Sequence, residues 1–130
     1  MPLPVAKTKN IALWILQVLL ALAFLGAGYA KLSGAPVMVQ SFEAIGVGQW
    51  FRYVTGGLEV VAATLLLVPF LIPIGAFLLT ATMLAAVATH LFLIGGDPTP
   101  AIVLLVLSSF VLWGRWNRIS PLIAPFRKGN

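Results

Sequence analysis

The strongest constraint on the fold of this chain is the stretch from Val60 to Gly96, which contains no charged residue. A second charge-free run, Ile11 to Ala30, has about the 20 residues that a helix needs to cross the hydrocarbon core of a membrane. Hydrophobic residues make up 61% of the 130 residues and charged residues only 8%. A soluble domain has roughly 25% charged residues. We therefore expect an integral membrane protein.

Prolines and glycines divide the chain into four predicted membrane-spanning helices. Pro69 and Pro73 bracket one turn, and Gly95 to Pro100 forms another. We expect the spans at about residues 11–30, 53–68, 74–94 and 101–116. The first run also has features of a secretory signal peptide, but it is longer than the roughly 7 to 15 apolar residues of such a signal. The sequence thus predicts a single all-α domain over residues 1–130, an integral membrane four-helix antiparallel bundle.

Residues 31–52 are too polar to span a membrane, and we expect them to form the outer loop. Pro36 is a helix-start signal and Gly46 a stop signal. Between them apolar residues recur at helical spacing, which predicts a short amphipathic helix over residues 36–45 in the membrane interface. Trp50 and Tyr53 would then belong to an aromatic belt at the start of the second span.

Small residues predict where the first two spans approach other helices. On the first span, Ala23 with Ala27 and Gly26 with Ala30 are spaced four apart. On the second span the small residues Gly56, Ala62 and Ala63 lie near Glu59. Small residues at such spacing allow two helices to pack closely in a membrane. We therefore expect these faces to be helix contacts.

The basic residues indicate the orientation of the chain. Six of them lie on the side of the termini, namely Lys7, Lys9, Arg115, Arg118, Arg127 and Lys128. Only Lys31 and Arg52 lie on the other side, so the positive-inside rule places both termini in the cytoplasm. The last span is short. We expect either that it extends past Arg115 with the arginines snorkelling to the interface, or that the bilayer thins locally. Because the aromatic and basic residues do not share one face, nucleic acid is not an expected partner.

Three titratable residues are predicted to lie at one depth near the outer face. Lys31 ends the first span, Glu59 lies about 9 Å into the second, and His90 lies about 6 Å before the end of the third. An ionisable group within a membrane is costly and commonly marks function. These residues are therefore a candidate polar site able to hold a quinone headgroup, a proton or a small polar ligand. The residues expected at its mouth are Trp50, Phe51, Arg52 and Tyr53.

Each of these residues also has a purely structural interpretation. Lys31 can snorkel to the interface, and His90 can be a neutral imidazole bonded to a backbone carbonyl or a hydroxyl group. Glu59 can form a structural ion pair with Lys31, Arg52 or His90, which would place the helices without adding much stability. In either case we predict that Glu59 contacts a polar group across the bundle rather than lipid.

The residue types limit the cofactors. The chain has no cysteine, which excludes disulfides and iron–sulfur ligation by this chain, and its single histidine excludes a bis-histidine haem within one subunit. We expect no metal site. Quinone is the cofactor that the residue types still allow. No complete set of catalytic residues is visible in the sequence.

Four short motifs in this order resemble the DoxX-like branch of the DoxX family of small four-helix membrane proteins. They are Gly28-Tyr29-Ala30-Lys31-Leu32, Phe42 to Gly46, Gly56-Gly57-Leu58-Glu59 and Met83 to His90. The resemblance covers about Ile11 to Arg115 and implies a multi-pass protein of the bacterial inner membrane. Within the family, one subunit belongs to a thiosulfate:quinone oxidoreductase, other members associate with redox-defence partners, and distant eukaryotic relatives act as receptor-assembly factors. The resemblance does not imply a catalytic role for Lys31, Glu59 or His90.

These observations lead to three hypotheses for function. The first is an accessory or quinone-interacting subunit of a membrane redox system. The second is a non-catalytic membrane assembly or interaction protein, in which the polar residues only set helix placement. A small transporter or proton path is the third, and it is disfavoured because the last two spans carry no second deep acidic group. The expected partners are the lipid bilayer and a membrane or redox protein.

Overall fold

The computed structural model describes residues 5–120, and within them the chain is all-α, with no strand. The all-α prediction is therefore confirmed. The helices are α1 (Val5–Ser33), α2 (Pro36–Ile45), α3 (Trp50–Leu65), the 3-10 turn η1 (Pro69–Leu71), α4 (Ile72–Thr89), the π-helical turn η2 (His90–Ile94), α5 (Thr99–Gly114) and the 3-10 turn η3 (Trp116–Arg118).

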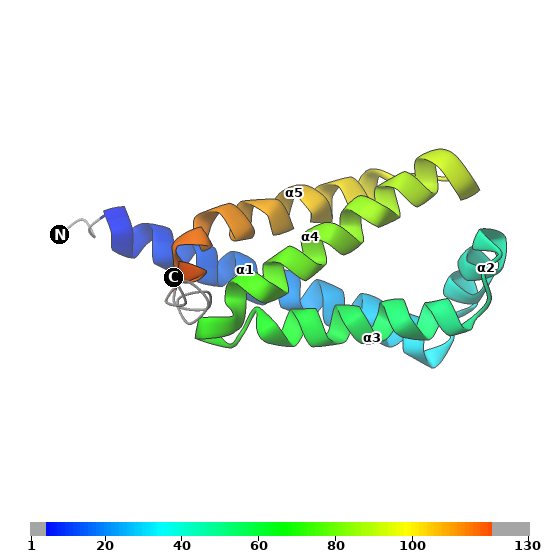
Figure 1. Cartoon of the computed structure of the whole chain (residues 1–130), viewed down its shortest axis with the longest axis horizontal. Coiled ribbons are helices and arrows are strands. Elements are labelled where there is room, and N and C mark those ends of the chain that lie inside the picture. The colour runs from blue at the N-terminus through cyan, green and yellow to red at the C-terminus, as the bar shows by residue number, and fades with distance from the viewer. Residues whose placement is uncertain (1–4, 121–130) are drawn as a thin grey trace, which may run out of the picture.

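The four long helices pack in two pairs, α1 with α3 and α4 with α5 (Figure 1). The pairs join because α3 contacts α4 and α1 contacts α5. The short helix α2 lies at one end of the molecule, where α1 ends and α3 begins, and it also contacts η2. We call this the α2 end. The opposite end holds the start of α1 and the end of α5, and we call it the terminal end.

The observed helices differ from the predicted spans mainly at their ends. α1 extends beyond both ends of the predicted span, and α3 begins at Trp50 rather than Tyr53. α5 begins at Thr99, whose backbone N–H donates to the Asp97 carboxylate at 2.9 Å. Hydrogen bonds from the side chain and the backbone of Thr99 hold the pKa of Asp97 below its usual value. α2 covers the residues expected for the amphipathic helix and ends at Gly46.

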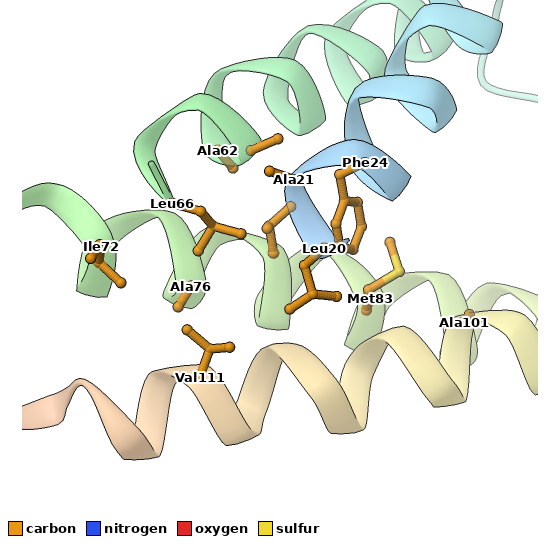
Figure 2. Packing of buried hydrophobic residues seen from close by; sticks show 12 residues of the cluster. Leu20, Ala21, Phe24, Ala62, Leu66, Ile72, Ala76, Met83, Ala101 and Val111 are labelled. Carbon is orange, nitrogen blue, oxygen red and sulfur yellow. The ribbon is translucent and has the colours of Figure 1, made fainter. Parts of the chain in front are cut away.

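The core lies where the two helix pairs meet (Figure 2). Phe24 and Leu20 of α1 point toward α4, and Val111 of α5 lies below Ala76 of α4. Buried alanines alternate with larger residues there, so the backbones approach closely while the larger side chains fill the remaining space. This packing fixes which face of each helix turns inward.

The outer faces of the helices are rich in exposed apolar side chains. Leu22 on α1, Phe77 on α4 and Val106 on α5 are 63%, 59% and 60% exposed. Two segments, Val5–Ser33 and Pro69–Ile94, are long and apolar enough to cross a membrane by length and composition, and α5 is apolar but shorter. Exposed apolar surface of this extent is expected where lipid, rather than water, covers the protein.

Candidate functional site

Lys31 and Glu59 form a buried ion pair that joins the end of α1 to α3. Lys31 Nζ lies 3.0 Å from Glu59 Oε1 and 3.2 Å from Oε2. Glu59 is 1% exposed and the Lys31 side chain 14% exposed. The predicted contact of Glu59 with a polar group of another helix is confirmed. Of the three possible partners, Lys31, Arg52 and His90, it is Lys31 that forms the ion pair. We call this pair the Lys31–Glu59 site.

A close crossing of α1 and α3 brings the two charges together. A methyl group on Gly56 would lie 2.8 Å from Cβ of Lys31 and 3.1 Å from the carbonyl oxygen of Gly28. Only glycine leaves enough room for this approach. The expectation for α1 was wrong for two of these residues, since a methyl group on Gly26 would meet nothing within 4 Å and Ala23 is exposed. Gly28, which the sequence did not single out for packing, makes the closest approach to α3, while Ala27 and Ala30 are half-buried.

Arg52 supports the end of α1 instead of pairing with Glu59. It is 5% exposed, and its Nη1 donates to the backbone carbonyl of Lys31. Its Nε donates to Gln49 Oε1 at 2.7 Å, and its guanidinium lies 4.4 Å from the centroid of the Tyr53 ring. Arg52 thus holds the Lys31 carbonyl, near the C-terminal end of α1, against the start of α3, a favourable position for a cation.

The other residues predicted at the mouth form an aromatic group at the α2 end. The Phe51 ring lies 5.7 Å from Phe42 of α2 and 5.8 Å from Trp50. The Gln49 side chain donates to the Val39 carbonyl at 3.0 Å, which ties α2 to the start of α3. These contacts place α2 over the beginning of α3.

His90 lies at the α2 end but is held by its own turn. Its Nδ1 is 2.8 Å from the carbonyl oxygen of Gly95. Within residues 5–120, no hydrogen bond or ion pair joins His90 to Lys31 or Glu59. The backbone bond agrees with the structural interpretation of this histidine. His90 also begins the π-helical turn η2, a geometry that occurs often at functional sites.

A second polar cluster, absent from the sequence predictions, lies at the terminal end. Arg115 Nε donates to Gln17 Oε1 at 2.7 Å, and Arg115 Nη1 donates to Asn10 Oδ1 at 2.7 Å. Gln17 Nε2 in turn donates to the Leu66 carbonyl at 2.8 Å. We call this the Gln17–Arg115 network.

This network corrects the expectation for Arg115. Arg115 was expected to snorkel, yet it is 4% exposed and turned inward, and α5 ends before it at Gly114. A carboxamide in the middle of a charge-free span was the available signal, because buried polar side chains in membranes bond across helices. Gln17 carried that signal, and Arg115, far away in the sequence, supplied the partner.

The chemistry available to these clusters depends on whether their polar groups already have ion-pair or hydrogen-bond partners. In the Lys31–Glu59 site both carboxylate oxygens face the ammonium group, so the two charges neutralise each other. In the Gln17–Arg115 network neutral oxygens surround a cation. Among residues 5–120, the buried Ser108 hydroxyl has no hydrogen-bond partner, and no three His, Cys, Asp or Glu side chains lie together as metal ligands would.

Comparison with known proteins gives one match. The model of the DoxX-like family matches residues 15–114, which include α3, α4, α5 and most of α1. No curated protein and no solved structure matches the chain. The matched range holds Lys31, Glu59 and His90 together with the crossing at Gly28 and Gly56. The chain belongs to the DoxX-like family.

Proposed function

We propose that the protein is a four-helix antiparallel bundle in the bacterial inner membrane, with both termini in the cytoplasm and α2 in the outer membrane interface. The exposed apolar side chains of the long helices support insertion. The orientation is supported by the basic residues of the terminal end, which are Lys7, Lys9, Arg115 and Arg118.

Within this arrangement we propose a non-catalytic role, as an accessory or assembly protein that docks another membrane protein. The Lys31–Glu59 site carries this proposal. Both Glu59 oxygens lie within 3.2 Å of Lys31 Nζ. Glu59 is also only 1% exposed, so the surrounding protein shields the carboxylate from a ligand. An ion pair satisfied in this way is suited to holding α1 and α3 in one arrangement.

The energetics of buried ion pairs support the same role. Desolvation of two charges offsets most of their attraction, so such a pair adds little net stability but penalises every arrangement that separates the charges. A membrane helix pair lacks the hydrophobic driving force that soluble helices have, because lipid is as apolar as the core. Lys31 and Glu59 would therefore specify the α1–α3 contact and hold the two helices in the one arrangement that a partner protein binds.

The second candidate is an accessory, quinone-interacting subunit of a membrane redox system. It is favoured by the 14% exposure of the Lys31 side chain, since an ammonium group can donate to a quinone carbonyl while it pairs with a carboxylate. Arg52 and Tyr53 lie at the same end. Because the chain has no cysteine, electrons would pass through the quinone itself or through a partner.

The two candidates are separated by purifying the tagged full chain from native membranes. The wild type is compared with the double variant Lys31→Met/Glu59→Gln, which removes both charges, and with Lys7→Gln as a control at the other end of α1. Quinone is measured relative to phospholipid by chromatography, and copurifying membrane proteins are identified and quantified by mass spectrometry.

The assembly role predicts one membrane protein at near-stoichiometric level in the wild type and the control. It also predicts a quinone-to-phospholipid ratio equal to that of the bulk membrane. Quinone enriched in the wild type and lost in the folded double variant would instead support the redox role. A preparation with neither a partner nor enriched quinone would contradict both candidates.

A further inference from the structure

The two ends of the molecule differ in charge. The chain has three acidic residues, Glu43 in α2, Glu59 in α3 and Asp97 before α5, and none lies at the terminal end. The basic residues of the terminal end are Lys7, Lys9, Arg115 and Arg118. No acidic side chain of the protein neutralises this end, so it attracts anions.

A groove of about 580 Å³ lies at this charged end, between the start of α1 and the end of α5. Its lining residues are Lys9, Ser109, Leu112, Trp113 and Trp116. Lys9 Nζ lies 5.2 Å from the centroid of the Trp113 ring. The volume is within the roughly 300 to 1,000 Å³ of small-molecule sites. The groove thus combines one cation with aromatic and aliphatic walls.

The groove offers hydrogen-bond donors that the described residues do not use. Within residues 5–120, Lys9 forms no ion pair, and the indole N–H groups of Trp113 and Trp116 make no hydrogen bond. The Ser109 hydroxyl already donates to the Leu105 carbonyl at 2.7 Å. The lining residues therefore carry an ammonium group and two indole N–H groups without a hydrogen-bond partner among the described residues, and such donors suit phosphate and ester oxygens.

An apolar strip continues from the groove along α5. Phe110 is 51% exposed, and its ring lies 5.8 Å from that of Trp113. Val106, one turn further along α5, is 60% exposed. A ligand that fills both the groove and the strip has an anionic head and an apolar tail, which a soluble anion lacks.

We propose that this groove binds one acidic phospholipid, with its phosphodiester on Lys9 and the indole N–H groups and its acyl chains along α5. A zwitterionic lipid brings its own cation beside Lys9, whereas an acidic lipid does not, so the groove prefers the acidic headgroup. Tryptophan and lysine are also the residues that contact the headgroup level of a bilayer. The proposal requires the chain to lie in a membrane, but it requires no role for the Lys31–Glu59 site.

The test uses the full chain in detergent with an equimolar mixture of phosphatidylglycerol and phosphatidylcholine of identical acyl chains. Native mass spectrometry measures the ratio of the two singly bound lipids. We expect the wild type to retain phosphatidylglycerol preferentially. Lys9→Gln should lower the ratio about fivefold, the factor that corresponds to roughly 1 kcal/mol for one lysine near an anionic surface. Lys7→Gln is the matched control, because it removes the same charge two residues away and Lys7 does not line the groove.

A second variant, Trp113→Leu, keeps every charge and removes one wall and one indole N–H, and it should also lower the ratio. Equal losses for Lys7→Gln and Lys9→Gln would indicate general attraction to a charged surface and overturn the proposal. A wild-type ratio near one, or an unchanged ratio in Trp113→Leu, would overturn it as well. Because the measurement concerns lipid only, its failure would leave the proposed partner or quinone role unaffected.

Discussion

At the residue scale, the contact between Lys31 and Glu59 leads us to expect that the two side chains are energetically coupled. Glu59 is 1% exposed and its nearer oxygen is 3.0 Å from Lys31 Nζ. Removing one member of a buried pair leaves an uncompensated charge and costs about 3 to 5 kcal/mol, whereas replacing both members with neutral side chains costs much less. The other polar groups of the α2 end cannot replace Lys31, because Arg52 is bonded to Gln49 and His90 to Gly95.

We predict that Lys31→Met lowers the free energy of unfolding by about 3 kcal/mol, and that Lys31→Met/Glu59→Gln loses less than Lys31→Met alone. The physical reason is that the second substitution removes the carboxylate that the first leaves unpaired. Unfolding of the wild type, both single variants and the double variant in one detergent gives the coupling energy. Lys7→Met, at an exposed position of the same helix, should unfold like the wild type. Additive losses would show that the two side chains are not coupled.

At the scale of elements, the crossing of α1 and α3 depends on two glycines that face each other. A methyl group added at Gly56 would meet Cβ of Lys31 and the backbone of Gly28, whereas one added at Gly57 would meet nothing within 4 Å. These adjacent positions lie on one helix and have the same side chain. They differ only in whether α1 covers them, so they form a matched pair.

We predict that Gly56→Ala lowers the free energy of unfolding by about 1 to 3 kcal/mol, because the added methyl group forces the two backbones apart. The shift should also weaken the ion pair, since Lys31 is the residue displaced. Gly57→Ala should leave stability unchanged or raise it, because alanine favours the helix. Thermal unfolding of both variants in the same detergent tests this. Equal losses at the two positions would contradict a close crossing at Gly56.

At the scale of the whole molecule, the distribution of charge predicts the orientation. The terminal end holds Lys7, Lys9, Arg115 and Arg118, while the α2 end holds Lys31 and Arg52. Lys31 is neutralised by Glu59, and Arg52 is 5% exposed and bonded to backbone and side-chain oxygens. Arg115 is likewise 4% exposed and bonded to side-chain oxygens. Once these buried or paired cations are set aside, Lys7, Lys9 and Arg118 remain within residues 5–120, all at the terminal end, which favours a cytoplasmic terminal end.

We predict that reporter fusions at Asn130 and in the Gly46 to Gly48 turn report opposite sides of the membrane, with Asn130 cytoplasmic. A reporter active only in the cytoplasm and one active only outside it should give complementary signals at each position. Fusions in the Val68 to Phe70 turn should match those at Asn130, because an even number of spans separates the two. The same side for Asn130 and the Gly46 to Gly48 turn would contradict the four-span topology.

The sequence by itself determined the apolar character of the helices, the all-α content and the family of this protein. Hydropathy is a sum over neighbouring residues, so the charge-free runs were sufficient to predict apolar helices. The bounds of α2 could be read locally too, because Pro36 and Gly46 act on their own turns. Burial of Glu59 against a polar group followed from the cost of leaving a charge in lipid.

Only the tertiary structure decided which groups meet, because that depends on how each helix is rotated and where two helices cross. The sequence left Lys31, Arg52 and His90 open as partners of Glu59, and the Gly28–Gly56 crossing selects Lys31. It likewise predicted an outward Arg115, whereas packing of α5 beside α1 turns that guanidinium inward to Gln17 at 2.7 Å. Residues 98 positions apart in the sequence form this bond, and periodicity within one helix carries no information about such a contact.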